Sequence, residues 1–306
     1  MKYLYSIIAI ISIFIITIFT FKDDIIYYNY AKYTIKNETK VTENIYHYTD
    51  DFSYVDDYSE LEIHNKEELY ETIYYLVNSG VTNAKRYFDI NYVDFEKDYN
   101  ELFSNKLKLN AINNFVHPYN TFTSINASLK GYMLEITIKY NESYNEQKRN
   151  EINKEVKSII TDLTNDKMNN KEKIKTIHDF IINNTTYDQN FCVEEKIENC
   201  ETTSKYQSDT AYGVLFEHNG ICSGYTDLIA IFLNELDITN YRVTNDSHTW
   251  NAIKLDNIWY HLDATWDDPI SEKEILTHTY FLITTNEDSL LEESHSFDKE
   301  IFTELS

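Results

Sequence analysis

The chain has 306 residues, of which 42% are hydrophobic and 15% are aromatic. This composition is typical of a folded protein and excludes an intrinsically disordered chain, and the length allows either one large domain or two. The formal net charge of −24 makes direct binding to nucleic acid or to an anionic membrane surface unfavourable, because both repel acidic proteins.

The amino-terminal segment predicts a membrane anchor. Residues 3–21 carry no charge and are rich in Ile and Phe. As a helix, a segment of this length can cross a hydrocarbon layer of about 30 Å. We therefore predict a transmembrane signal anchor over 1–22, and the charges flanking it place the amino terminus in the cytoplasm and the rest outside. The segment lacks a small-x-small cleavage pattern, so an uncleaved anchor is favoured over secretion after signal cleavage.

Residues 23–60 are polar and tyrosine-rich without a clear period, and they predict a linker. A small α+β domain is predicted over 61–164. Its expected elements are a short strand at 61–63, a helix starting at the capping-box-like pair Asn65 and Glu68, a strand at 86–90, a helix over 94–106, a hairpin over 121–140 and a helix from Glu146.

Residues 165–306 are predicted to form the second domain, with the charged stretch 166–173 as its boundary. A helix is expected next, because its apolar residues recur at helical spacing, and His178 on that stripe is predicted to be a buried core histidine. Further on, 280–283 is predicted to be the last core strand, followed by a closing helix around Phe302.

Cys222 lies at the start of an apolar helix pattern, and the unpaired N–H groups of a helix N-terminus favour a thiolate. Three of the chain's 5 glycines, Gly213, Gly220 and Gly224, lie close to this cysteine. Glycine permits positive φ and lets other groups approach the backbone closely, so we expect another group to come close to the backbone around the thiol. A nucleophilic cysteine needs a histidine base and an orienting group, whereas a free cysteine alone is often only a buried apolar residue.

Residues 247–266 predict a β-hairpin that turns at Asp256-Asn257. Counting outward from this turn pairs Leu255 with Ile258, and puts His248 and Asp263 on one face as diagonal neighbours, roughly 7 to 8 Å apart. The opposite face is mostly apolar and is predicted to be the core face, so His248 and Asp263 are expected on the non-core face.

The order of these motifs resembles the bacterial transglutaminase-like superfamily of papain-type cysteine enzymes. The resemblance covers residues 165–270 and includes Gly-x-Cys-x-Gly-Tyr, His-x-Trp-Asn and Trp-Tyr-x-x-Asp-x-Thr-Trp-Asp-Asp-Pro. It implies an α+β fold in which a nucleophile helix packs on an antiparallel sheet. By position, Cys222 would be the nucleophile, His248 the general base and later the acid, and Asp263 the group that orients the imidazole.

Other residues near these motifs are candidates for the cleft. Gly220 is a cleft candidate, Tyr212 is a candidate second oxyanion donor, Trp250 is expected to wall the cleft and shield the imidazole, and His261 could line it. In an oxidising compartment Cys192 and Cys200 could form a disulfide. A zinc site using these two cysteines lacks ligand spacing, and the chemistry requires no metal or cofactor.

The expected function is extracellular, cysteine-dependent acyl transfer on peptide amides of a peptide or protein substrate at the cell surface. Water as the acyl acceptor gives a peptidase or deamidase, and an amine gives a transglutaminase. The alternative is a non-catalytic, surface-anchored module that binds peptide or wall with the same fold.

Overall fold

The computed structural model describes residues 23–36, 41–191, 204–269, 277–287 and 293–305. The predicted anchor over 1–22 and the proposed Cys192–Cys200 disulfide lie outside these ranges. None of the helices within them is both long and apolar enough to cross a membrane. The chain divides into two compact units, the second of which consists of Tyr48–Val55, Ala111–Thr121 and Asn141 to the end.

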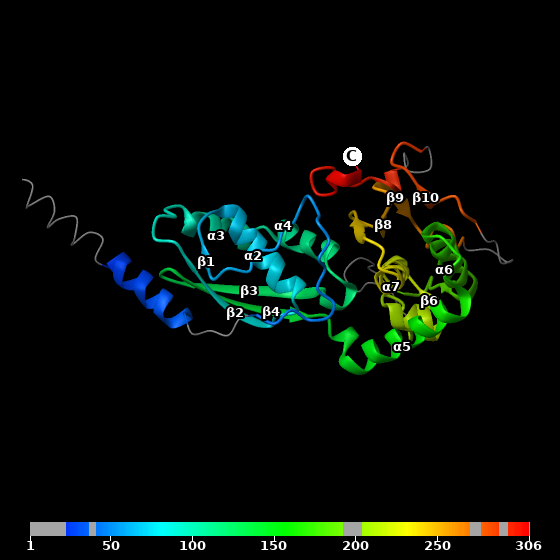
Figure 1. The fold of residues 1–306 in the computed structure, drawn as a ribbon, viewed down its shortest axis with the longest axis horizontal. Helices are drawn as coiled ribbons and strands as arrows, with labels where there is room; N and C mark the ends of the chain where they lie inside the picture. The colour runs from blue at the N-terminus through cyan, green and yellow to red at the C-terminus, as the bar shows by residue number, and fades with distance from the viewer. Residues whose placement is uncertain (1–22, 37–40, 192–203, 270–276, 288–292, 306) are drawn as a thin grey trace, which may run out of the picture. The chain divides into compact units, whose positions relative to one another are not determined.

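The first unit is built on a four-stranded sheet of order β1-β2-β4-β3. Helix α2 lies alongside this sheet (Figure 1). Strand β1 pairs with β2 in parallel, and the other pairs are antiparallel. The elements are β1 (Glu62–Ile63), α2 (Lys66–Asn78), β2 (Asn83–Phe88), α3 (Phe95–Ser104), α4 (Lys106–Ala111), β3 (Phe122–Lys130) and β4 (Met133–Tyr140).

Local sequence signals account for these elements. The Asn65 side chain accepts a hydrogen bond from the Glu68 N–H at 2.9 Å and thereby begins α2. Just after the end of α2, Gly80 has a φ of 71° and turns the chain away from the helix. Gly131, with φ of 58°, turns the hairpin between β3 and β4. These starts and turns lie where the sequence predicts them.

Residues 23–35 form a helix, so the expectation of a structureless linker over 23–60 was wrong for this part. Tyr28, Ala31 and Ile35 recur at helical spacing, and the last two are fully buried. The Tyr28 hydroxyl donates to the Glu62 carboxylate of β1 at 2.6 Å. The sequence hides this stripe, because other large apolar and aromatic residues of the same helix stay exposed: Ile25, Ile26, Tyr27, Tyr30 and Tyr33.

The second unit contains an antiparallel sheet of order β10-β9-β8-β7, with α7 packed against β7 and β8 and contacted by α5 and α6 (Figure 1). Its elements are α5 (Glu146–Leu163), α6 (Asn170–Asn184), β5 (Thr186–Tyr187), β6 (Asn219–Gly220), α7 (Cys222–Glu235), β7 (Asn240–Thr244), β8 (Thr249–Leu255), β9 (Ile258–Leu262) and β10 (Phe281–Ile283).

The boundary between the units differs from the one expected at 164. Helix α5 belongs to the second unit, because its buried residues Ile152, Val156 and Ile159 face the side that contacts α7. The charged stretch 166–173 is instead the approach to α6, which a capping box between Asn169 and Glu172 begins.

Strand β8 is buried on both faces, which corrects the expectation of a non-core face. Asn251 donates to the Thr226 carbonyl of α7 at 3.0 Å, while Trp250 and Ala252 on the other face are 1% and 0% exposed. Aromatic residues from distant segments cover that second face: Phe52 lies 5.6 Å and Phe302 5.9 Å from the Tyr241 ring of β7. The expected closing helix is a single 3-10 turn, Thr303–Leu305.

Candidate active site

Cys222 is the first residue of α7, as the sequence predicts, and it is a free, half-buried cysteine. The preceding residue, Ile221, is extended, and its N–H donates to the Ser208 carbonyl at 2.8 Å. Strand β6, paired in parallel with β5, leads directly into this turn. The thiol is therefore attached where the chain changes from strand to helix, beside N–H groups that favour negative charge.

The three glycines near Cys222 leave space that neighbouring atoms of the same chain occupy. None has a positive φ. A Cβ on Gly213 would lie 2.1 Å from the Gln207 carbonyl oxygen, one on Gly224 would lie 2.3 Å from that of Ser208, and one on Gly220 would meet Val214 and Tyr225 at 2.7 Å. The expected close approach is thus intramolecular packing, and the buried Gly220 is a packing residue of this turn.

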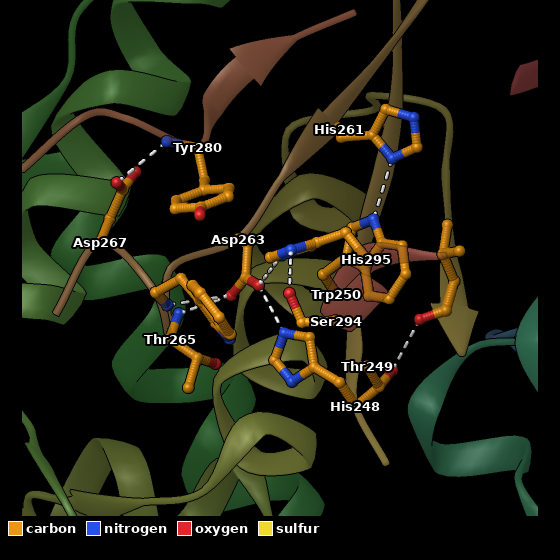
Figure 2. A network of polar contacts seen from close by, with 12 residues as sticks. His248, Thr249, Trp250, His261, Asp263, Thr265, Asp267, Tyr280, Ser294 and His295 are labelled. Atoms are coloured by element: carbon orange, nitrogen blue, oxygen red, sulfur yellow. Dashed lines mark hydrogen bonds and ion pairs between the residues drawn. The ribbon is translucent and has the colours of Figure 1, made fainter. Parts of the chain in front are cut away.

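The predicted hairpin brings His248 and Asp263 together. Asp256 and Asn257 form the turn with φ of 51° and 62°, and the register runs from Leu255↔Ile258 to Asn251↔Leu262. His248 and Asp263 lie just beyond the ends of the paired strands. Their Nε2 and Oδ2 atoms are 2.5 Å apart (Figure 2).

Asp263 is buried and accepts four hydrogen bonds. Oδ1 accepts from the N–H groups of Thr265 and Trp266 at 2.9 and 3.2 Å, and Oδ2 accepts from His248 and from His295, the latter at 2.9 Å. Burial alone would raise the pKa of this carboxyl, but the hydrogen bonds from the two imidazoles outweigh burial and lower it. Asp263 is therefore an ionised carboxylate with every acceptor position used.

His248 has a fixed ring orientation. Because a carboxylate can only accept, Nε2 carries the proton toward Asp263, which leaves Nδ1 as the nitrogen available to the thiol. Burial opposes protonation of the ring, but hydrogen bonds with Asp263 and Cys222 outweigh it and raise the pKa of His248 to about 9. An imidazolium at neutral pH, beside a cysteine, is the arrangement that a thiolate–imidazolium pair needs.

His295 is a site residue that the sequence did not reveal. It is fully buried, and its Nε2 donates to the same Asp263 oxygen that His248 uses. It lies in the acidic tail, on the turn Glu293–His295, where no motif or periodicity marks it. Only the folded chain brings it to Asp263.

Trp250 stacks on the His248 ring, with centroids 5.6 Å apart and an angle of 20° between the planes. Its indole N–H donates to His261 Nδ1 at 2.9 Å, and His261 Nε2 lies 3.0 Å from the Thr285 hydroxyl. Trp250 thus covers the imidazole as expected. His261 is only 1% exposed, so it positions the tryptophan and does not line a cleft, and burial lowers its pKa to about 3.

The oxyanion candidate Tyr212 lies elsewhere. Its ring packs on Phe216 at 4.8 Å, and its hydroxyl interacts with Glu151 of α5. Tyr187 is the tyrosine near the thiol: it pairs with Gly220 between β5 and β6, and burial followed by the charge of Cys222 raises the pKa of its hydroxyl. Tyr187 therefore replaces Tyr212 as the candidate donor.

A second buried pair lies on the turn that carries Asp263. His178 of α6, the core histidine predicted from sequence, has Nε2 3.2 Å from Asp267 Oδ2, and both side chains are fully buried. The two atoms are close, but their geometry is not that of a hydrogen bond. The Tyr280 N–H donates to the other oxygen of Asp267 at 3.0 Å (Figure 2). This contact places the turn between β9 and β10 against α6.

Three groups of described residues have ligand-type atoms close enough together for a metal ion. They are His248 with Asp263 and His295, His178 with Asp179 and His278, and Glu62 with His64 and Asp89. In the first group the carboxylate already accepts hydrogen bonds from both imidazole rings. In the second group the Lys175 ammonium lies 2.6 Å from Asp179 and already neutralises that carboxylate. We assign a metal to none of them.

Residues 157–264 match the Transglutaminase-like superfamily model, so this part of the chain is a transglutaminase-like superfamily domain. A crystal structure of a TGase is similar at 14% identity and a TM-score of 0.35, over 56% of this chain and 50% of that one. A protein from Cytophaga hutchinsonii, described as a candidate cysteine protease, is similar at 13% identity and a TM-score of 0.26, over 46% and 61%. The comparison with curated proteins gave no match.

Proposed function

We propose that this protein is a cysteine-dependent acyl-transfer enzyme that acts on peptide amides through Cys222, His248 and Asp263. The observation that carries the proposal is the 2.5 Å contact between His248 Nε2 and a fully hydrogen-bonded Asp263. Hydrogen bonds with Asp263 and then with Cys222, at the start of α7, raise the pKa of the same imidazole. A nucleophile, a base and an orienting carboxylate are the parts that this chemistry requires.

In the proposed reaction the Cys222 thiolate attacks an amide carbonyl, and the C–S bond forms as the carbonyl π electrons move to oxygen. The Cys222 N–H and the Tyr187 hydroxyl donate to this oxyanion. When the C–N bond breaks, His248 gives its proton to the leaving amine and becomes neutral. It then takes a proton from water or from an amine, which attacks the thioester and releases Cys222 as the thiolate.

The site of action is also part of the proposal. We propose that the segment over 1–22 anchors the protein in the cell membrane and that the enzyme acts outside the cell on peptides or proteins at its surface. The composition of that segment supports this placement.

Labelling with iodoacetamide at pH 6 tests the catalytic assignment. An ordinary thiol with a pKa of about 8.5 is almost entirely protonated there, whereas a thiolate paired with an imidazolium is not, so we expect Cys222 to react about 100-fold faster than free cysteine. Mass spectrometry of the labelled peptide separates Cys222 from Cys192 and Cys200. His248→Ala should remove the acceleration; ordinary reactivity of Cys222 in the unaltered protein would exclude the proposal.

Tyr187→Phe is expected to slow acylation by p-nitrophenyl acetate about 100-fold, because one oxyanion donor is lost. Iodoacetamide labelling should stay unchanged, since alkylation forms no oxyanion. Tyr212→Phe is the matched control, because its hydroxyl lies toward α5. Equal acylation rates in the Tyr187→Phe and Tyr212→Phe proteins would remove Tyr187 from the mechanism.

A further inference from the structure

His295 contacts the triad carboxylate from a second direction. Its Nε2 lies 2.9 Å from Asp263 Oδ2, the oxygen that His248 Nε2 contacts at 2.5 Å, and the planes of the two rings are 85° apart. Figure 2 shows both rings directed at this one carboxylate. We infer that His295 is a positioning residue for the proposed reaction: it shares Asp263 with His248 and limits how strongly the carboxylate holds the catalytic proton.

The ring of His295 cannot turn away from Asp263. It stacks on the Tyr280 ring, with centroids 4.7 Å apart and an angle of 18° between the planes. Trp250 and Trp266 pack against it in edge-to-face geometry, with centroid distances of 5.1 and 4.9 Å. The Ser294 hydroxyl lies 3.3 Å from Nδ1, where it can donate to the unprotonated nitrogen. A ring with its N–H on Nε2 therefore satisfies every contact.

This contact has a direct chemical effect on His248. A carboxylate oxygen that already accepts one N–H attracts a second proton less strongly, so His295 weakens the pull of Asp263 on the His248 imidazolium. A general acid that is held too firmly is a poor donor to the leaving amine. His295 thus keeps the imidazolium acidic enough to complete the transfer, while the two backbone N–H groups on Oδ1 keep the carboxylate in place.

The other titratable groups around the three side chains come from separate elements. Cys222 of α7 faces His248, His261 of β9 and Tyr280 face His295, and Tyr187 of β5 is within reach of the charges of Cys222 and Asp263. Of these, Cys222 faces His248 directly, so the alkylation of its sulfur can report the charge on the imidazole ring.

The test uses two alkylating reagents and rests on the proposed function. Both reagents react with the thiolate, but only iodoacetate, which is anionic, is also attracted by the charge of the neighbouring imidazolium. The ratio of the iodoacetate rate to the iodoacetamide rate at Cys222 therefore falls where His248 loses its proton. In the unaltered protein we expect this fall near pH 9, the pKa of His248. In His295→Phe, which keeps an aromatic ring among the others, it should move upward by about 0.5 to 1 pH unit.

His295→Gln supplies an amide N–H near the position of Nε2 and should return the fall in the ratio to its original pH. Thermal unfolding verifies that both variants are folded. A purely structural histidine would leave the pH of the fall unchanged in His295→Phe, and that result, or a downward shift, would overturn the inference. Absence of any pH-dependent ratio in the unaltered protein would instead contradict the proposed function.

Discussion

Asp263→Asn is expected to lower the acylation rate with p-nitrophenyl acetate by about 10⁴-fold, although the residue keeps its shape. The amide oxygen can still accept from the N–H groups of Thr265 and Trp266, which leaves the NH₂ group facing the two imidazole N–H groups. Donor then meets donor, and His248 must move its proton to Nδ1, the nitrogen that has to accept from the thiol. The rate of p-nitrophenol release measures the effect.

Asp263→Ala separates orientation from stability. Its acylation rate with p-nitrophenyl acetate should fall by a factor similar to that of Asp263→Asn. It should also unfold more easily than Asp263→Asn, because His295 and the two backbone N–H groups lose their buried acceptor. The Asn and Ala variants should therefore differ in unfolding midpoint and agree in rate. An Asn variant within tenfold of the unaltered rate would contradict the role given to the carboxylate.

Arg242→Ala is expected to destabilise the second unit by about 3 to 5 kcal/mol, the largest stability effect we predict. Arg242 Nη1 lies 2.9 Å from Asp227 Oδ1, and the Tyr144 hydroxyl donates to the other oxygen at 2.6 Å. Both the arginine and the aspartate are largely buried. Without the guanidinium, an uncompensated carboxylate remains in the core beneath α7. Urea unfolding followed by tryptophan fluorescence measures the loss, since all three tryptophans lie in this unit.

The loss should be smaller at pH 5 than at pH 7.5. Burial already raises the pKa of Asp227, and Arg242 is the main group that opposes the rise, so the variant raises that pKa further. A folded-state pKa above the unfolded value costs stability at high pH, and the cost disappears as the pH falls and the carboxyl binds a proton. Lys157→Ala breaks an exposed ion pair with Glu235 in the same unit, and as a control it should cost less than about 1 kcal/mol.

The sequence predicts those parts of the site that lie close together in the chain. The Asp256-Asn257 turn fixes the hairpin register, and the register places His248 beside Asp263. His295 could not be predicted, because its contact with Asp263 depends on where a long tail packs. The double burial of β8 was missed for the same reason: the covering residues come from 48–55, 111–121 and the last turn, which no local pattern links to this sheet.

Side-chain roles were harder to predict than positions. Placing Tyr212 and His261 in the cleft required knowing which way each side chain points, and that depends on contacts with α5 and with Trp250. Tyr187 lies near Cys222 because β5 pairs with β6, which leads into Cys222. The sequence does not reveal this proximity, because the two strands are short and far apart in the chain.

The glycines around Cys222 have one further consequence. Gly213, Gly220 and Gly224 are small because neighbouring backbone and side-chain atoms occupy the space that a Cβ would need. That constraint is steric and does not involve the sulfur atom, so Cys222→Ser and Cys222→Ala should leave the shape of this turn unchanged. The glycine spacing thus reports the shape of the turn, whereas activity has to be judged from the thiol, the two imidazoles and the carboxylate between them.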